Sequence, residues 1–96
     1  MLISEIASVL HAKVLAQGED LEVNTIVYDS RKATGSPNEL FIALSGSNHD
    51  GHEYISSLIE RGSKNFLVAK ENKMSTSNIN ILLVDDVMAA FQLLAK

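Results

Sequence analysis

The chain has 96 residues, of which 46% are hydrophobic and 21% are charged, a composition typical of one soluble globular domain. Eight Lys and Arg residues against twelve Asp and Glu residues give a formal net charge of -4. Because nucleic acids and anionic membranes are bound through basic surfaces, neither is expected as a partner. The absence of cysteine excludes disulfides, thiol catalysis and thiolate metal sites. No apolar run approaches the roughly 20 residues that span a bilayer, so we expect a cytoplasmic protein.

The sequence pattern predicts helices that alternate with strands. In chain order we expect a helix capped by Ser4 and reaching about Ala12, strands at 23–28 and 40–44, a helix stripe from Ile55 that stops at Gly62, strands at 65–69 and 81–84, and a last helix capped by Asp85 or Asp86. This alternation predicts an α/β fold, with a small mixed or parallel sheet flanked by helices, and one domain over residues 1–96. The last helix reaches Lys96 without a stop signal, so we expect a longer protein.

The segment LFIALSGSNHDGHEYI, residues 40–55, reads as a strand, a polar loop bounded by glycines, and a helix. Such a loop points backbone N–H groups at its ligand, which suits an anion or a carbonyl oxygen. Gly46 and Gly51 have the spacing of a phosphate-binding loop, but His and Glu follow them where that loop needs Lys and Ser or Thr. The sequence therefore favours a nucleotide-type cradle without hydrolytic machinery, or a plain connection capped by Asp50.

The tripeptide Asp29-Ser30-Arg31 follows a predicted strand, and the ends of strands are where ligands bind in α/β sheets. Its three side chains could contact a ligand. They could equally form a local turn in which Arg31 pairs with Asp29.

A metal site is an alternative for His49, Asp50 and His52, and it would indicate a small metal-dependent hydrolase. Two histidines and one carboxylate leave such a site short of ligands unless His11 or a distant acid joins them. We therefore predict no metal site and no catalytic residue in this chain.

Several motifs taken in order, YDSRK, ELFIALSG, HDGHEYI and RGSKNFLV, resemble the N-terminal domain of the Mur ligases, which act late in peptidoglycan precursor synthesis. The motif sequences are most similar to those of the family branch that adds D-alanyl-D-alanine. The branch that adds the third amino acid is the close alternative. Members usually have a Pro-Gly pair before the LF strand, whereas this chain has TGSPNEL. At this point the sequence resembles the Mur ligases that are fused to an alanine racemase.

The resemblance implies a UDP-N-acetylmuramoyl-peptide binding module of an ATP-dependent amide-bond ligase. ATP and Mg²⁺ would bind the full-length enzyme through central and C-terminal domains that this sequence lacks. Ser30 matches the motif residue that contacts uridine, and the loop after the LF strand would wrap the uracil and the ribose. The substrate-binding candidates are Ser30, Arg31, Ser47, Asn48, His49 and Asp50. A free-standing nucleotide-sugar binding or regulatory domain without catalysis is the rival interpretation.

Overall fold

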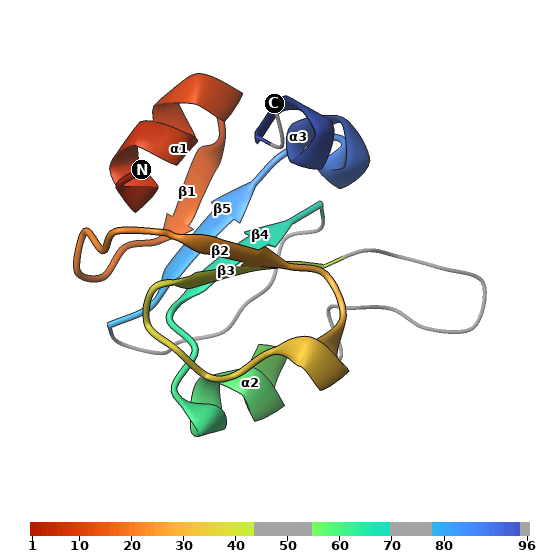
Figure 1. The fold of residues 1–96 in the computed structure, drawn as a ribbon. Coiled ribbons are helices and arrows are strands. Elements are labelled where there is room, and N and C mark those ends of the chain that lie inside the picture. Colours follow the sequence, from red (N-terminus) through yellow and green to blue (C-terminus); the bar gives the residue numbers. More distant parts are fainter. Residues whose placement is uncertain (44–54, 70–77, 95–96) are drawn as a thin grey trace.

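The computed structural model describes residues 1–43, 55–69 and 78–94, which form a single sheet with helices on both faces (Figure 1). The elements are α1 (Ile3–Leu10), β1 (Lys13–Ala16), β2 (Thr25–Val27), a 3₁₀ turn (Ser30–Lys32), β3 (Glu39–Ile42), α2 (Ile55–Arg61), β4 (Asn65–Val68), β5 (Asn80–Leu83) and α3 (Val87–Leu94). The strand order is β1-β5-β4-β3-β2, with β1 antiparallel to β5 and the other neighbours parallel. The predicted α/β fold with a mixed sheet is confirmed.

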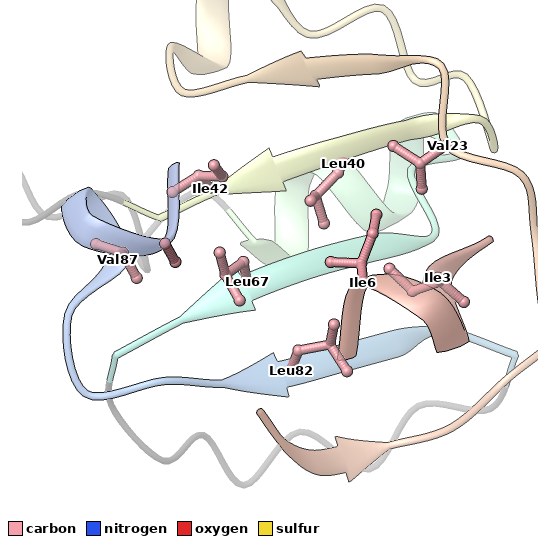
Figure 2. Close-up of a cluster of buried hydrophobic side chains, with 9 residues drawn as sticks. Ile3, Ile6, Val23, Leu40, Ile42, Leu67, Leu82 and Val87 are labelled. Carbon is pink, nitrogen blue, oxygen red and sulfur yellow. The ribbon is translucent and has the colours of Figure 1, made fainter. Parts of the chain in front are cut away.

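Both faces of the sheet are buried, which explains why the central strands are continuously apolar. In β3, Leu40 and Ile42 pack on the face covered by α1 and α3, whereas Phe41 packs on the opposite face with residues of α2. Figure 2 shows the first of these clusters, whose members come from the sheet, α1, α3 and the segment before β2. The buried members of this cluster are Ile3, Ile6, Val23, Leu40, Ile42, Leu67, Leu82, Val87 and Ala90.

The first helix begins at Ile3 with Leu2 as its N-cap, so the predicted cap at Ser4 is wrong. Ser4 lies inside the first turn, where its backbone N–H donates to Asp20 Oδ1 at 2.9 Å and its hydroxyl donates to Asp20 Oδ2 at 2.7 Å. Glu5 accepts the Leu2 N–H at 2.8 Å. A residue sixteen positions further along the chain therefore satisfies part of the helix N-terminus, which a local capping rule does not foresee.

The strand β1 was not predicted. α1 ends at His11, which has left-handed backbone angles (φ 53°), and the chain turns directly into the strand. β1 pairs with β5, and its register shifts between Val14 and Ala16. The four-residue segment has no strong strand signal of its own. It becomes a strand by pairing with β5, which lies nearly 70 residues further along the chain.

The remaining predicted elements within the described residues are present, with bounds that differ by one or two residues. Gly62 follows α2 with φ +113°, as expected for a left-handed stop. Asp86 caps α3, because its Oδ1 accepts the N–H groups of Met88 and Ala89 at 3.0 and 3.1 Å. Leu44, the last residue of a predicted strand, lies outside the described residues. No helix among the described residues is long and apolar enough to cross a membrane.

Candidate functional site

The DSR tripeptide lies at the carboxyl edge of the parallel strands. β2 ends at Val27, which pairs with Phe41 of the parallel neighbour β3, so both strands end at the same edge of the sheet. Ser30 begins the 3₁₀ turn just beyond β2, and the polar loop leaves β3 after Ala43 at this edge. The fold thus places the DSR turn and Ala43, the last described residue before the loop, at the edge where α/β sheets bind ligands.

The loop itself, residues 44–54, lies outside the described residues. The assignments of Ser47, Asn48, His49 and Asp50 therefore stay predictions, as does the role of the Ser30 hydroxyl. The alternative metal site also falls in this loop. Within the part of the chain that the structure describes, no group of three or more His, Cys, Asp or Glu side chains could hold a metal ion.

Asp29 and Arg31 form a local pair within the turn. Asp29 Oδ1 accepts the Arg31 backbone N–H at 3.0 Å and its Nε–H at 3.2 Å, and Oδ2 accepts from Nη2 at 3.1 Å. The hydrogen bonds from the Arg31 side chain lower the pKa of the Asp29 carboxyl below its ordinary value of 3.8, and the backbone hydrogen bond acts in the same direction. The Arg31 side chain is 88% exposed, so this pair shapes the turn at the surface of the protein. The local pairing considered from the sequence is present.

A short crossover, residues 28–38, carries the chain from the end of β2 back to the start of β3. It runs on the α2 side of the sheet (Figure 1), and Ala33 packs there in the second apolar cluster with Phe41 and residues of α2. Near its end, the N–H and hydroxyl of Thr34 donate to the Glu39 carboxylate. These contacts were not predicted from the sequence, because the sequence does not indicate which residue a carboxylate at the start of a strand will bond to.

A chain of buried amides ties together the opposite, amino edge of the sheet. Asn65 donates from Nδ2 to the Pro37 carbonyl at 2.9 Å, and its Oδ1 accepts from Asn80 Nδ2 at 3.0 Å. Asn80 Oδ1 in turn accepts the Gly18 N–H at 2.9 Å. These amides therefore hold the segments at Gly18 and Pro37 to the starts of β5 and β4. They too were not predicted from the sequence.

A cavity of about 220 Å³ opens at the same amino edge, between α1, β1 and the start of β5. Its lining includes Ser4, Val14, Asp20, Asn80 and Leu82. The polar groups of Ser4 and Asp20 bond to each other, and both ends of the Asn80 amide bond to protein groups. The cavity lies at the opposite end of the strands from the DSR turn and is not part of that candidate site.

Comparison with known proteins places this chain among ligases of cell-wall synthesis. A family model described as "Mur ligase family, catalytic domain" matches residues 22–96. The chain is 34% identical over 92 residues, 96% of its length, to the UDP-N-acetylmuramoyl-tripeptide--D-alanyl-D-alanine ligase of Haemophilus influenzae, and it covers 19% of that protein. It is 38% identical over 68 residues, 71% of its length, to the UDP-N-acetylmuramoyl-L-alanyl-D-glutamate--2,6-diaminopimelate ligase of Fusobacterium nucleatum, and it covers 13% of that protein.

The fold is also that of a solved structure. A crystal structure of MurF from Acinetobacter baumannii superimposes with a TM-score of 0.74 over 91% of this chain and 18% of that one, at 23% sequence identity. The chain thus spans less than a fifth of the length of these proteins. Because the family model covers three quarters of the chain and the Haemophilus ligase is similar over almost all of it, this protein belongs to the Mur ligase family.

Proposed function

We propose that this chain is the UDP-N-acetylmuramoyl-peptide binding module of an ATP-dependent Mur ligase of the type that adds D-alanyl-D-alanine. The observation that carries the proposal is the 34% identity to the Haemophilus ligase over 96% of the chain, against 30% identity over the whole chain to a diaminopimelate ligase of Clostridium tetani. The ordered motifs from YDSRK to RGSKNFLV support the assignment to a Mur ligase module. The module would hold the UDP end of the substrate and supply no bond-making group.

The substrate site in this proposal lies at the carboxyl edge of β2 and β3. Ser30 would contact the uridine, and Ser47, Asn48 and His49 would surround the uracil and ribose. Arg31 and Asp50 would contact the substrate or support the loop. The common edge of the DSR turn and the loop start supports this site, because residues from both segments can then approach one ligand.

The bond-making step is proposed for other parts of a longer cytoplasmic protein. ATP, with Mg²⁺, would transfer its terminal phosphoryl group to the terminal carboxylate of the UDP-linked peptide and leave as ADP. The amine of D-alanyl-D-alanine would then attack the carbonyl carbon of this acyl phosphate, forming the amide and releasing phosphate. In this chain the glycine pair is followed by His and Glu in place of Lys and Ser or Thr, so its own loop does not fit a triphosphate. Its residues bind and orient the other end of the peptide substrate.

A second candidate is the ligase that adds the third amino acid. The Fusobacterium diaminopimelate ligase favours it, with the higher identity of 38% over a shorter stretch. Both types share the motifs discussed above.

An assay of the full-length protein separates these candidates. Purified protein is incubated with Mg-ATP and either UDP-muramoyl tripeptide plus D-alanyl-D-alanine, or UDP-muramoyl dipeptide plus diaminopimelate or lysine, and phosphate release is measured together with the product mass. We expect turnover only with the first pair. Turnover only with the second would assign the alternative ligase, and UDP binding without either reaction would indicate the free-standing binding domain.

A further inference from the structure

Glu39 is a buried carboxylate at the first residue of β3, with only 3% of its surface exposed. Both of its oxygens bond to one residue of the crossover, Thr34. Oε1 accepts the Thr34 N–H at 3.1 Å, and Oε2 accepts the Thr34 hydroxyl at 2.9 Å. Because both carboxyl oxygens of this buried side chain bond to the same residue, the pair is a clamp between β3 and the crossover.

The clamp is close to the Ser30–Lys32 turn along the chain, while Glu39 itself lies at the amino end of β3. Thr34 follows the Ser30–Lys32 turn by two residues, and only Ala33 lies between them. A turn of three residues buries little apolar surface, so it depends on its neighbours for a fixed position on the sheet. The Asp29–Arg31 pair shapes the turn from within, whereas Glu39 attaches the chain that follows it to a central strand.

We infer that Glu39 is a positioning residue, which through Thr34 holds the Ser30–Lys32 turn where it meets the UDP end of the substrate. The inference rests on the proposed function and gives Glu39 no contact with substrate. Without the clamp, the turn should sample other positions while the sheet stays folded. Substrate binding then weakens, but the chemical step on a bound substrate proceeds at its usual rate.

The test uses two clamp variants of the full-length protein, Glu39→Gln and Thr34→Val. Glu39→Gln keeps the side-chain size and removes the charge. Thr34 is an exposed residue, so Thr34→Val removes the hydroxyl with little effect on the core. We expect each variant to raise the KM for the UDP-muramoyl peptide about five- to tenfold, as for one lost hydrogen bond, with kcat and the KM for ATP within about twofold. Thr34→Ser keeps the hydroxyl and should retain the wild-type KM.

Asn80→Ala is the matched control. Asn80 is as buried as Glu39, at 3% exposure, and it also ties a loop to the sheet, but its side-chain hydrogen bonds go to Gly18 and Glu19 on the β1 side and to Asn65 of β4. This variant should lower the melting temperature and leave the KM for the UDP-peptide unchanged. An equal rise in KM for Asn80→Ala would overturn the inference, because general loss of stability would then explain the effect.

Hydrogen exchange of the ligand-free protein provides a second readout. Peptides covering residues 29–35 should exchange about tenfold faster in both clamp variants, whereas Asn80→Ala should leave them unchanged. Unchanged exchange in the clamp variants would overturn the inference. Normal wild-type turnover with unaltered KM in the clamp variants would also overturn it, and would leave the proposed function standing. A wild-type protein that neither binds nor uses the UDP-peptide would overturn the proposed function and the binding role of Glu39 together.

Discussion

The carbonyl oxygen of Gly35 lies so close to Gly62 that a Cβ added to Gly62 would stand 2.7 Å from it. Both glycines have positive φ angles, +80° and +113°. A Cβ added to Gly35 would likewise collide with the Arg61 carbonyl oxygen. The crossover from β2 to β3 and the end of α2 therefore meet backbone to backbone, in a contact that requires glycine on both sides.

We expect Gly35→Ala and Gly62→Ala each to destabilise the fold by about 1 to 3 kcal/mol, from backbone strain and steric overlap. Ser57→Ala, at an exposed position of α2, should change stability by less than about 0.5 kcal/mol. Urea unfolding followed by circular dichroism measures all three. Because one shift of the crossover relieves both overlaps, the double glycine variant should cost less than the sum of the singles. Wild-type stability in either single variant would contradict the close approach.

Asp86 and Asp85 provide a matched test of the cap of α3. Asp86 accepts two N–H groups of the first turn, so Asp86→Ala should cost about 1 kcal/mol of unfolding free energy. Asp85→Ala removes the neighbouring charge without removing that cap and should cost less than about 0.5 kcal/mol. Denaturant midpoints of the two variants decide between them. Equal losses would mean that general charge near the helix N-terminus, and not the cap hydrogen bonds, stabilises α3.

The Asp29–Arg31 pair should be visible in an acid titration. The pKa of Asp29 in the folded protein lies below its ordinary value of 3.8. The stability that this pair contributes is therefore fully present above the unfolded pKa, and it is lost as the pH falls through the lower folded pKa. Carboxyl ¹³C shifts should give a midpoint for Asp29 below 3.8, and Arg31→Met should move it back towards that value.

Lys13→Met, on the opposite edge strand, should leave the Asp29 midpoint unchanged, because the cations that lower this pKa are Arg31 and Lys32. A wild-type midpoint at 3.8 or above would show that the guanidinium does not hold the carboxylate in solution.

Ser30→Ala in the full-length protein should raise the KM for the UDP-muramoyl peptide and leave the KM for ATP nearly unchanged. The loss of one net hydrogen bond corresponds to about 0.5 to 1.5 kcal/mol. Steady-state kinetics with each substrate varied in turn gives both constants. Equal effects on the two substrates would remove Ser30 from the uridine site.

UDP should bind this 96-residue chain alone only weakly, with a Kd on the order of 1 mM, because part of a site supplies few contacts and bears the full cost of association. Amide shifts of labelled protein should change at Ser30, Arg31 and residues 46–52, and uridine should move much the same set. ATP should give no binding in calorimetry, since the loop lacks the phosphate-binding Lys. Shifts centred on residues 70–80, or equal responses to UMP and AMP, would refute the uridine site.

The class of fold and the order of most elements can be predicted from the amino-acid sequence. Continuous apolar runs such as Leu40 to Ile42 indicate strands covered on both faces, and the spacing of Ile55, Leu58 and Ile59 indicates a helix. These signals depend on neighbouring residues and on the period of each element, so they can be read without coordinates. The ordered motifs likewise identified the family before any structural comparison.

The contacts between distant segments cannot be predicted from local sequence patterns and depend on the fold. The strand β1 exists through its pairing with β5, and the N-terminus of α1 is satisfied by Asp20 where the sequence suggested Ser4 as the cap. For the candidate site, the sequence supplied the DSR turn, while the fold showed Arg31 bonded to Asp29 and Thr34 held by Glu39. A hydrogen bond depends on where two groups meet in space, and the fold brings these groups together through pairings that local sequence patterns do not encode.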